Sequence, residues 1–154
     1  MQRAIEGFHQ DALGDWVADL SCGHGQHVRH KPPFWLRPWT LTAEGRSSRV
    51  GSELDCVRCD RFEMPEGFVS YKRTGEFDER IIPAGLLANH STKHGVWGVL
   101  RVLEGGLSYI VEPPLAREVF VDAEHPAVIV PEVAHRVRPE GAVRFFVEFF
   151  RKHG

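Results

Sequence analysis

Three cysteines, all placed before residue 60 of a 154-residue chain, restrict the fold more than any other feature of the sequence. Together with a histidine they form two short motifs, Cys22-Gly-His24 and Cys56-Val-Arg-Cys59. Thiolates and imidazoles bind zinc tetrahedrally, and a Cys-x-x-Cys turn brings two sulfur atoms to one ion. The sequence therefore predicts a structural Zn²⁺ whose four ligands are Cys22, His24, Cys56 and Cys59.

Two other histidines leave the ligand set of this metal site open. His27 and His30 lie close enough in sequence to replace a member of the first pair. The alternative to a metal site is a set of free thiols with histidines at the surface. A redox role for the second motif is less favoured, because Cys56 opens no evident helix that would lower its pKa. The odd number of cysteines favours a reducing compartment over a disulfide framework.

The segment that carries these cysteines is small enough to benefit from a bound ion. Residues 1–64 are few for a hydrophobic core alone, so a metal would add stability. The stretch 64–67, Met-Pro-Glu-Gly, is typical of a linker, and after it the composition becomes rich in Val, Leu and Phe. We predict a Cys/His-rich, zinc-binding domain at 1–64 and a second domain at 65–154.

Alternating apolar residues and regularly spaced turn residues predict that both domains are mainly β. Residues 1–20 are typical of strands, with a hairpin turn at Gly14-Asp15. Three prolines exclude a regular helix from 26–39, and 42–46 is either a short helical turn or a loop. In the second domain, glycines and prolines separate strand candidates typical of an antiparallel sandwich or barrel. These candidates are 68–73, 81–82, 96–103, 107–111, 117–121, 127–130, 135–137 and 143–150.

Charge and hydropathy exclude several classes of partner. The net charge is −2, and no apolar run approaches the roughly 20 residues of a membrane span. Arg29, Lys31 and Arg37 are mixed with aromatic residues, a pattern that can bind single-stranded nucleic acid. Because this half has no basic excess, we favour packing of the arginines on the tryptophans instead. The sequence thus predicts a cytoplasmic protein with neither nucleic acid nor a membrane as partner.

A QHVRH motif, Gln26 to His30, follows the first cysteine in the N-terminal half. Together with the two cysteine motifs it resembles a family of uncharacterised bacterial domains of unknown function. Nearly the whole half is similar to that family, although the resemblance implies no activity. The other matching segments are 7–11, 15–18, Pro32-Pro33 and 37–39.

A second set of short motifs surrounds two histidines of the C-terminal half. It includes His90-Ser-Thr-Lys93, Val102-Leu-Glu-Gly105, and Pro131 followed by His135. This set is similar to the cupin superfamily. It more closely resembles the small domain at the N-terminus of some tellurite-resistance TehB methyltransferases and in stand-alone YeaR-like proteins. The resemblance covers roughly 68–151 and implies an antiparallel β-sandwich of the double-stranded β-helix type.

This resemblance implies a metal site in the second domain on His90 and His135. Glu148 is the candidate third ligand, because it shares one strand face with Phe146 and Phe150 and a carboxylate there needs a charged partner. A mixed histidine and carboxylate site with open positions suits Zn²⁺ or Fe²⁺.

Several assignments around this second site stay open at the level of the sequence. The alternative for Glu148 is an ion pair with Arg144 or Arg101. His94 is left undecided as a ligand. Lys93 is a candidate for holding an anion and Trp97 for forming a pocket wall, although a solvated charge and a core residue are their simpler roles.

The two halves together predict a small metal-binding cupin protein that handles a small-molecule or anionic ligand. The resemblance implies a role in tolerance of tellurite, nitrosative or oxidative stress. One alternative is a cupin metalloenzyme, an oxygenase or isomerase, although the sequence assigns no catalytic residue. Another is a regulatory or interaction module that senses a ligand. Exposed strand edges also lead us to expect a homodimer.

Overall fold

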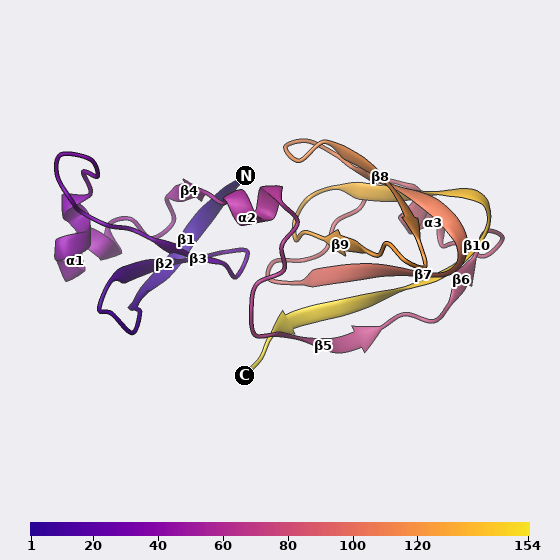
Figure 1. Cartoon of the computed structure of the whole chain (residues 1–154), viewed down its shortest axis with the longest axis horizontal. Coiled ribbons are helices and arrows are strands. Elements are labelled where there is room, and N and C mark those ends of the chain that lie inside the picture. The colour runs from indigo at the N-terminus through magenta and orange to yellow at the C-terminus, as the bar shows by residue number, and fades with distance from the viewer. The chain divides into compact units, whose positions relative to one another are not determined.

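The structure, a computed structural model, describes all residues from 1 to 154. The chain divides into two compact units, Met1–Arg58 and Cys59–Gly154 (Figure 1). This division falls inside the short helix α2 (Val57–Asp60), six residues before the linker predicted at 64–67. Strands make up 48% of the chain and helices 11%, which confirms the mainly-β class. Each unit is described by itself below.

An antiparallel sheet of four strands forms the N-terminal unit. Its strand order is β3 (Gly25–His27), β2 (Trp16–Leu20), β1 (Gln2–Gln10) and β4 (Glu53–Asp55). The β1–β2 hairpin matches the strands predicted for residues 1–20, and its turn, residues 11–15, includes the predicted Gly14-Asp15. Its turn is closed by the Asp11 carboxylate, which accepts hydrogen bonds from the backbone N–H groups of Leu13 and Asp15, both 2.9 Å long.

Two short helical segments follow the proline-rich stretch of this unit. A 3₁₀ helix covers Pro38–Leu41, and α1 covers Ala43–Ser47. Thr42 caps α1, because its hydroxyl accepts a hydrogen bond from the Gly45 N–H at 3.0 Å. The structure therefore selects the helical turn over the loop at 42–46.

The C-terminal unit is a six-stranded antiparallel sheet dominated by two long strands. The main path runs β5 (Phe68–Arg73), β10 (His135–Lys152), β7 (Trp97–Val111) and β8 (Arg117–Asp122). Two short strands extend it, β6 (Phe77–Asp78) on β10 and β9 (Ala127–Ile129) on β7. The helix α3 (Ala84–Leu87) lies before β7 in the chain. The mainly-β architecture is confirmed, whereas the double-stranded β-helix predicted from the resemblance is not.

The two long strands differ from the shorter strands predicted in their place. Gly105 (φ 73°) in β7 and Gly141 (φ 81°) in β10 adopt left-handed backbone conformations without ending the strands. The β7–β10 register shifts between Pro139 and Val143, so the strand continues through a bulge. Residues 81–82, predicted as a strand, form a turn in which the Ile81 N–H donates to the Asp78 carbonyl at 3.1 Å.

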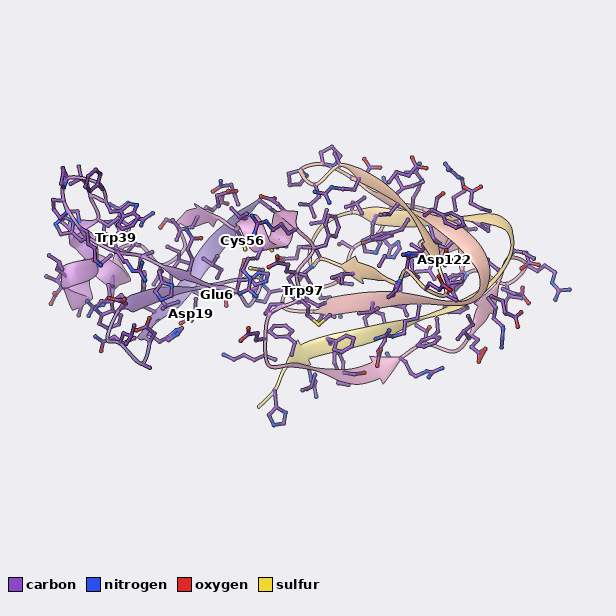
Figure 2. The ribbon with its side chains drawn as sticks, in the orientation of Figure 1. Glu6, Asp19, Trp39, Cys56, Trp97 and Asp122 are labelled. Atoms are coloured by element: carbon purple, nitrogen blue, oxygen red, sulfur yellow. The ribbon has the colours of Figure 1, made fainter.

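The interior of this unit is built from side chains that alternate along the long strands. Trp97, Leu107, Tyr109 and Phe145 are each at most 1% exposed. Figure 2 shows Trp97 inside the C-terminal unit.

None of the helices is long and apolar enough to cross a membrane.

We expect Gly105→Ala to lower the free energy of unfolding by more than about 2 kcal/mol. The left-handed backbone disfavours any side chain, and a Cβ at this position would overlap the Ala142 carbonyl group. Chemical denaturation followed by tryptophan fluorescence would measure the change. Gly75→Ala is the matched control, because nothing lies within 4 Å of its added Cβ. Equal stabilities of the two variants would contradict this account of the bulge.

Candidate metal centre and ligand pocket

Cys22 and His24 come from the tight connection between β2 and β3. Gly23 adopts φ 96°, and its N–H donates to the Leu20 carbonyl at 2.9 Å. The Leu20 N–H donates back across the turn to the His24 carbonyl, also at 2.9 Å. A residue with a Cβ would be strained at this φ, so the glycine permits the turn that points both ligand side chains the same way.

Cys56 and Cys59 come from the segment that joins β4 to helix α2. The Cys56 N–H donates to the Met1 carbonyl at 2.7 Å, which ties this segment to the start of β1. Cys59 lies one helical turn further on, within α2. The i, i+3 spacing in a helical turn places both sulfur atoms on one side of the backbone.

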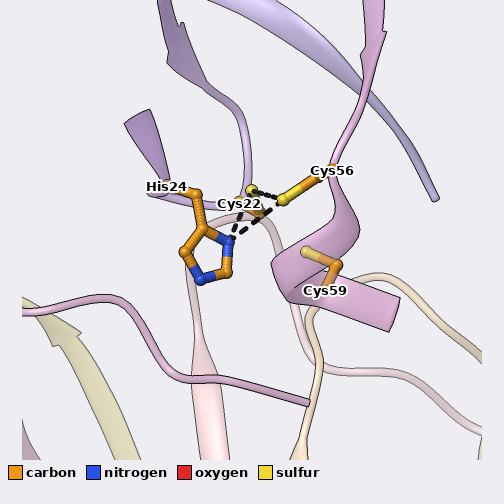
Figure 3. Close-up of side chains that lie close together, drawn as sticks. All are labelled: Cys22, His24, Cys56 and Cys59. Atoms are coloured by element: carbon orange, nitrogen blue, oxygen red, sulfur yellow. Dashed lines mark hydrogen bonds between the residues drawn. The ribbon is translucent and has the colours of Figure 1, made fainter. Parts of the chain in front are cut away.

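The four predicted side chains converge on one buried point (Figure 3). Their ligand atoms all lie within 4.8 Å of one another. The Sγ atoms of Cys22 and Cys56 are 3.8 Å apart, and each lies 3.3 Å from Nδ1 of His24. Tetrahedral zinc would require about 3.8 Å between two sulfurs and about 3.5 Å between sulfur and nitrogen. The cluster can therefore hold a metal ion such as zinc.

Burial and protonation of this cluster also fit a metal site. Cys22 and Cys59 are 0% exposed, Cys56 is 3% exposed and His24 is 2% exposed. Burial lowers the pKa of His24, but its hydrogen bonds to the two thiol groups outweigh burial and raise the pKa to about 9. A proton thus occupies, in the metal-free cluster, the place that a cation bound by thiolates would take.

The two alternative histidines lie outside the cluster. Nε2 of His27 is 2.7 Å from the Asp11 carboxylate, and Nδ1 of His30 accepts a hydrogen bond from the Arg37 N–H at 3.0 Å. Both side chains therefore have other partners, which leaves His24 as the only histidine of the cluster.

The second predicted site begins with a backbone bridge between His90 and His135. The N–H of each residue donates to the carbonyl of the other, at 3.0 and 2.8 Å. Residues paired in this way across an antiparallel bridge project their side chains to the same side. The two imidazole rings consequently meet, with centroids 4.3 Å apart.

Each imidazole of the pair is oriented by a carbonyl two residues earlier in the chain. Nδ1 of His90 is 3.1 Å from the Ala88 oxygen, and Nδ1 of His135 is 3.0 Å from the Val133 oxygen. A carbonyl oxygen only accepts, so in both rings Nδ1 carries the proton and Nε2 keeps its lone pair. Metal-binding histidines commonly have this arrangement, with one ring nitrogen donating to a backbone carbonyl.

His135 is held in its neutral form. It is 2% exposed and packs between the rings of His90 and Tyr109. Burial, and next the neighbouring His90, lower the pKa of His135 to about 4. His135 therefore offers a neutral nitrogen donor at neutral pH.

The remaining predicted residues of this site have separate places. Glu148 accepts a hydrogen bond from the Arg101 guanidinium at 2.8 Å, which is the ion pair that the sequence left as an alternative. Trp97 is fully buried in the core. His94 lies 3.9 Å from the Glu132 carboxylate. Of the set, Lys93 lies beside the histidines and lines the same pocket.

The histidine pair opens into a pocket of about 350 Å³. Sequence reasoning missed most of its wall, including Lys72 and Phe149. The alternation of β5 and β10 could have identified them, because Lys72 and Phe149 are register partners on adjacent strands. The main lining residues are Tyr71, Lys72, Leu86, His90, Ser91, Lys93, Val96, Ile129, His135, Val147 and Phe149.

Family models match both halves of the chain. Residues 6–63 match a family described as a protein of unknown function, DUF3565, and residues 72–147 match the TehB-like domain. Both resemblances predicted from the motifs are thereby confirmed. A comparison with curated protein sequences gave no match.

Two solved structures resemble part of the chain. A protein from Escherichia coli strain K12 has 22% identity and a TM-score of 0.54, with 60% of this chain and 98% of that chain covered. TehB from Haemophilus influenzae has 25% identity and a TM-score of 0.52, with 56% of this chain and 32% of that chain covered. The first likeness shows shared fold alone. This chain spans about a third of the length of TehB.

We expect His24→Ala to lose zinc and His27→Ala to retain it. Removing one ligand of a closed tetrahedral site weakens binding severely, whereas His27 contacts only Asp11 at the surface. Zinc per chain after dialysis against a weak chelator would separate the variants, with far-UV circular dichroism reporting the fold. Loss of zinc from His27→Ala alone would show that the ligand set is different.

Acidification should destabilise the metal-free C-terminal unit. Because the folded pKa of His135 lies near 4 and an unfolded histidine titrates near 6.5, the unfolded state binds the extra proton. The stability is full above pH 6.5 and falls by up to about 3 kcal/mol as the pH drops to 4.

Urea denaturation at several pH values, with a chelator present, would measure this slope. His135→Asn is the matched variant, because its amide can still donate to the Val133 carbonyl but does not titrate. The part of the slope due to His135 should vanish in the variant; identical slopes would contradict the assignment.

Proposed function

We propose that this chain is a two-module metal-binding protein, with a structural zinc in the N-terminal module and a small-molecule pocket in the TehB-like module. In this proposal the pocket also holds a transition-metal ion on His90 and His135. The observation that carries it is the convergence of three thiols and one imidazole within 4.8 Å in a buried position. No other group of residues in the structure has this composition.

The N-terminal ion would be structural because its coordination is closed. Three cysteines and one histidine satisfy the tetrahedral preference of zinc and leave no position for water or substrate. The surrounding core also contains few large apolar residues, among them Ile5, Leu20 and Val28. An ion that joins the β2–β3 turn to α2 would supply the cohesion that such a core lacks.

The pocket ion would have a different character. The Nε2 atoms of His90 and His135 would supply two ligands, and Glu148 adds none while it pairs with Arg101. A site with two protein ligands keeps positions open for water or a bound molecule, and Zn²⁺ and Fe²⁺ are the ions that suit its donors. Such an ion would supply Lewis acidity, and the residues of this chain would orient the molecule that meets it.

Binding rather than catalysis is the activity that we assign to this pocket. No carboxylate lies among its lining residues to act as a general base beside the histidines. The chain also corresponds to only 32% of TehB from Haemophilus influenzae, so the activity of that whole protein is not carried over. The role in tellurite, nitrosative or oxidative stress rests on the resemblance alone, because no residue of either site identifies such a substrate.

Cellular location and assembly follow from the same proposal. The Sγ atoms of Cys22 and Cys56 are close enough to oxidise to a disulfide, which would destroy the zinc site. We therefore place the protein in the reducing cytoplasm. The homodimer predicted from the sequence would form along an outer strand, β5 or β8, of the C-terminal sheet.

Metal content per chain tests the proposal directly. After anaerobic reconstitution, we expect two ions in the wild type, one in Cys56→Ser/Cys59→Ser and one in His90→Ala/His135→Ala, measured by plasma mass spectrometry. His94→Ala is the control and should retain both ions. If the histidine double variant keeps two ions, the pocket site fails; if the cysteine variant does, the zinc site fails.

A further inference from the structure

The pocket beside the histidine pair has a one-sided distribution of charge. Its lining includes Lys72 on β5 and Lys93 in the loop before β7, besides the two histidines. No aspartate or glutamate lines it. Neither lysine forms an ion pair with a carboxylate elsewhere in the chain, unlike most of the arginines of this unit.

The rest of the wall consists of apolar side chains together with the hydroxyl-bearing residues Tyr71, Thr74, Ser91 and Thr92. Leu86 and Val96 come from the segment before β7, Ile129 from β9, and Val147 and Phe149 from β10. The cavity measures about 350 Å³, which is within the range of pockets that bind small molecules. A hydrated inorganic ion would leave these apolar surfaces uncovered, so the walls favour a ligand with an apolar body.

From these two features we infer that the pocket binds a small organic anion, a carboxylate carried on a compact apolar body. The inference rests on the ligand pocket of the proposed function and names the chemical class of its ligand. The apolar body would contact Ile129, Val147 and Phe149. The carboxylate would face Lys72 and Lys93, and its oxygens are also ligands that the open positions of a metal ion on the histidines accept.

The alternatives differ from this ligand in charge. A cationic molecule would be repelled by both lysines and would find no acidic partner in the wall. A neutral molecule would bury the same apolar surface but would leave the two ammonium groups unpaired. Molecules of the same shape but different charge should therefore bind with different affinities, and this difference identifies the ligand class.

Benzoate, benzyl alcohol and benzylamine form such a series, because they share a ring and differ in charge. We expect benzoate to bind the metal-loaded full-length protein at least tenfold more tightly than benzyl alcohol, and benzylamine not to bind, by isothermal titration calorimetry. Lys72→Gln and Lys93→Gln should each weaken benzoate about three- to fivefold, the size expected for ion pairs at an exposed rim. Lys31→Gln, in the N-terminal unit, is the control and should leave benzoate binding unchanged.

Equal affinity for benzoate and benzyl alcohol would overturn the inference, as would no binding of any probe. Wild-type affinity for benzoate in a variant that carries both Lys72→Gln and Lys93→Gln would also overturn it. The lysines are exposed, so their variants should fold, which circular dichroism would verify. His90→Ala/His135→Ala separates this inference from the metal site. If that variant keeps as many ions as the wild type and still binds benzoate through the lysines, the anion pocket stands and the pocket metal of the proposed function fails.

Discussion

Contact among three thiol sulfurs and one imidazole is the interaction on which the N-terminal unit depends. Cys22, His24, Cys56 and Cys59 occupy the place where a larger protein would have leucines and phenylalanines. Polar and ionisable groups buried in this way stabilise a fold only when they have strong partners. A divalent ion bound here would provide such partners to all four ligands, and it would join the β2–β3 turn to the segment that carries Cys56 and Cys59.

In the C-terminal unit the imidazoles do not hold the fold together. There a large apolar interior, with Trp97 and Phe145 at its centre, maintains the fold without an ion. His90 and His135 are fixed by the main chain, through their mutual bridge and through the carbonyls that bind their Nδ1 atoms. Their free nitrogens face a pocket instead of a closed cluster. The chain thus combines a closed cluster, in which all four ligand atoms converge on one point, with a histidine pair whose Nε2 atoms face a pocket.

Local sequence patterns predicted the parts of this structure that depend on local chemistry. The cysteine motifs identified the metal cluster because zinc ligation fixes residue types and spacings, and the motifs around His90 and His135 identified the pair. Patterns failed where tertiary context decided the outcome. Glycines often mark the ends of strands, so the sequence predicted shorter strands here. In the structure β7 and β10 continue through Gly105 and Gly141, because the two strands stay paired along their length. Glu148 had two candidate partners, and its diagonal pairing with Arg101, which is opposite Phe146, depended on register that no single strand reveals.

The bridge between His90 and His135 also determines when each site can arise during synthesis. The last cysteine of the N-terminal cluster is residue 59, so all four of its ligands are synthesised before the second half of the chain. The pocket cannot form until His135 has been synthesised and β10 has docked along β7. Because domains generally fold in the order of their synthesis, the thiol cluster would capture its ion while the pocket does not yet exist. The order of synthesis therefore places assembly of the cysteine cluster before assembly of the pocket.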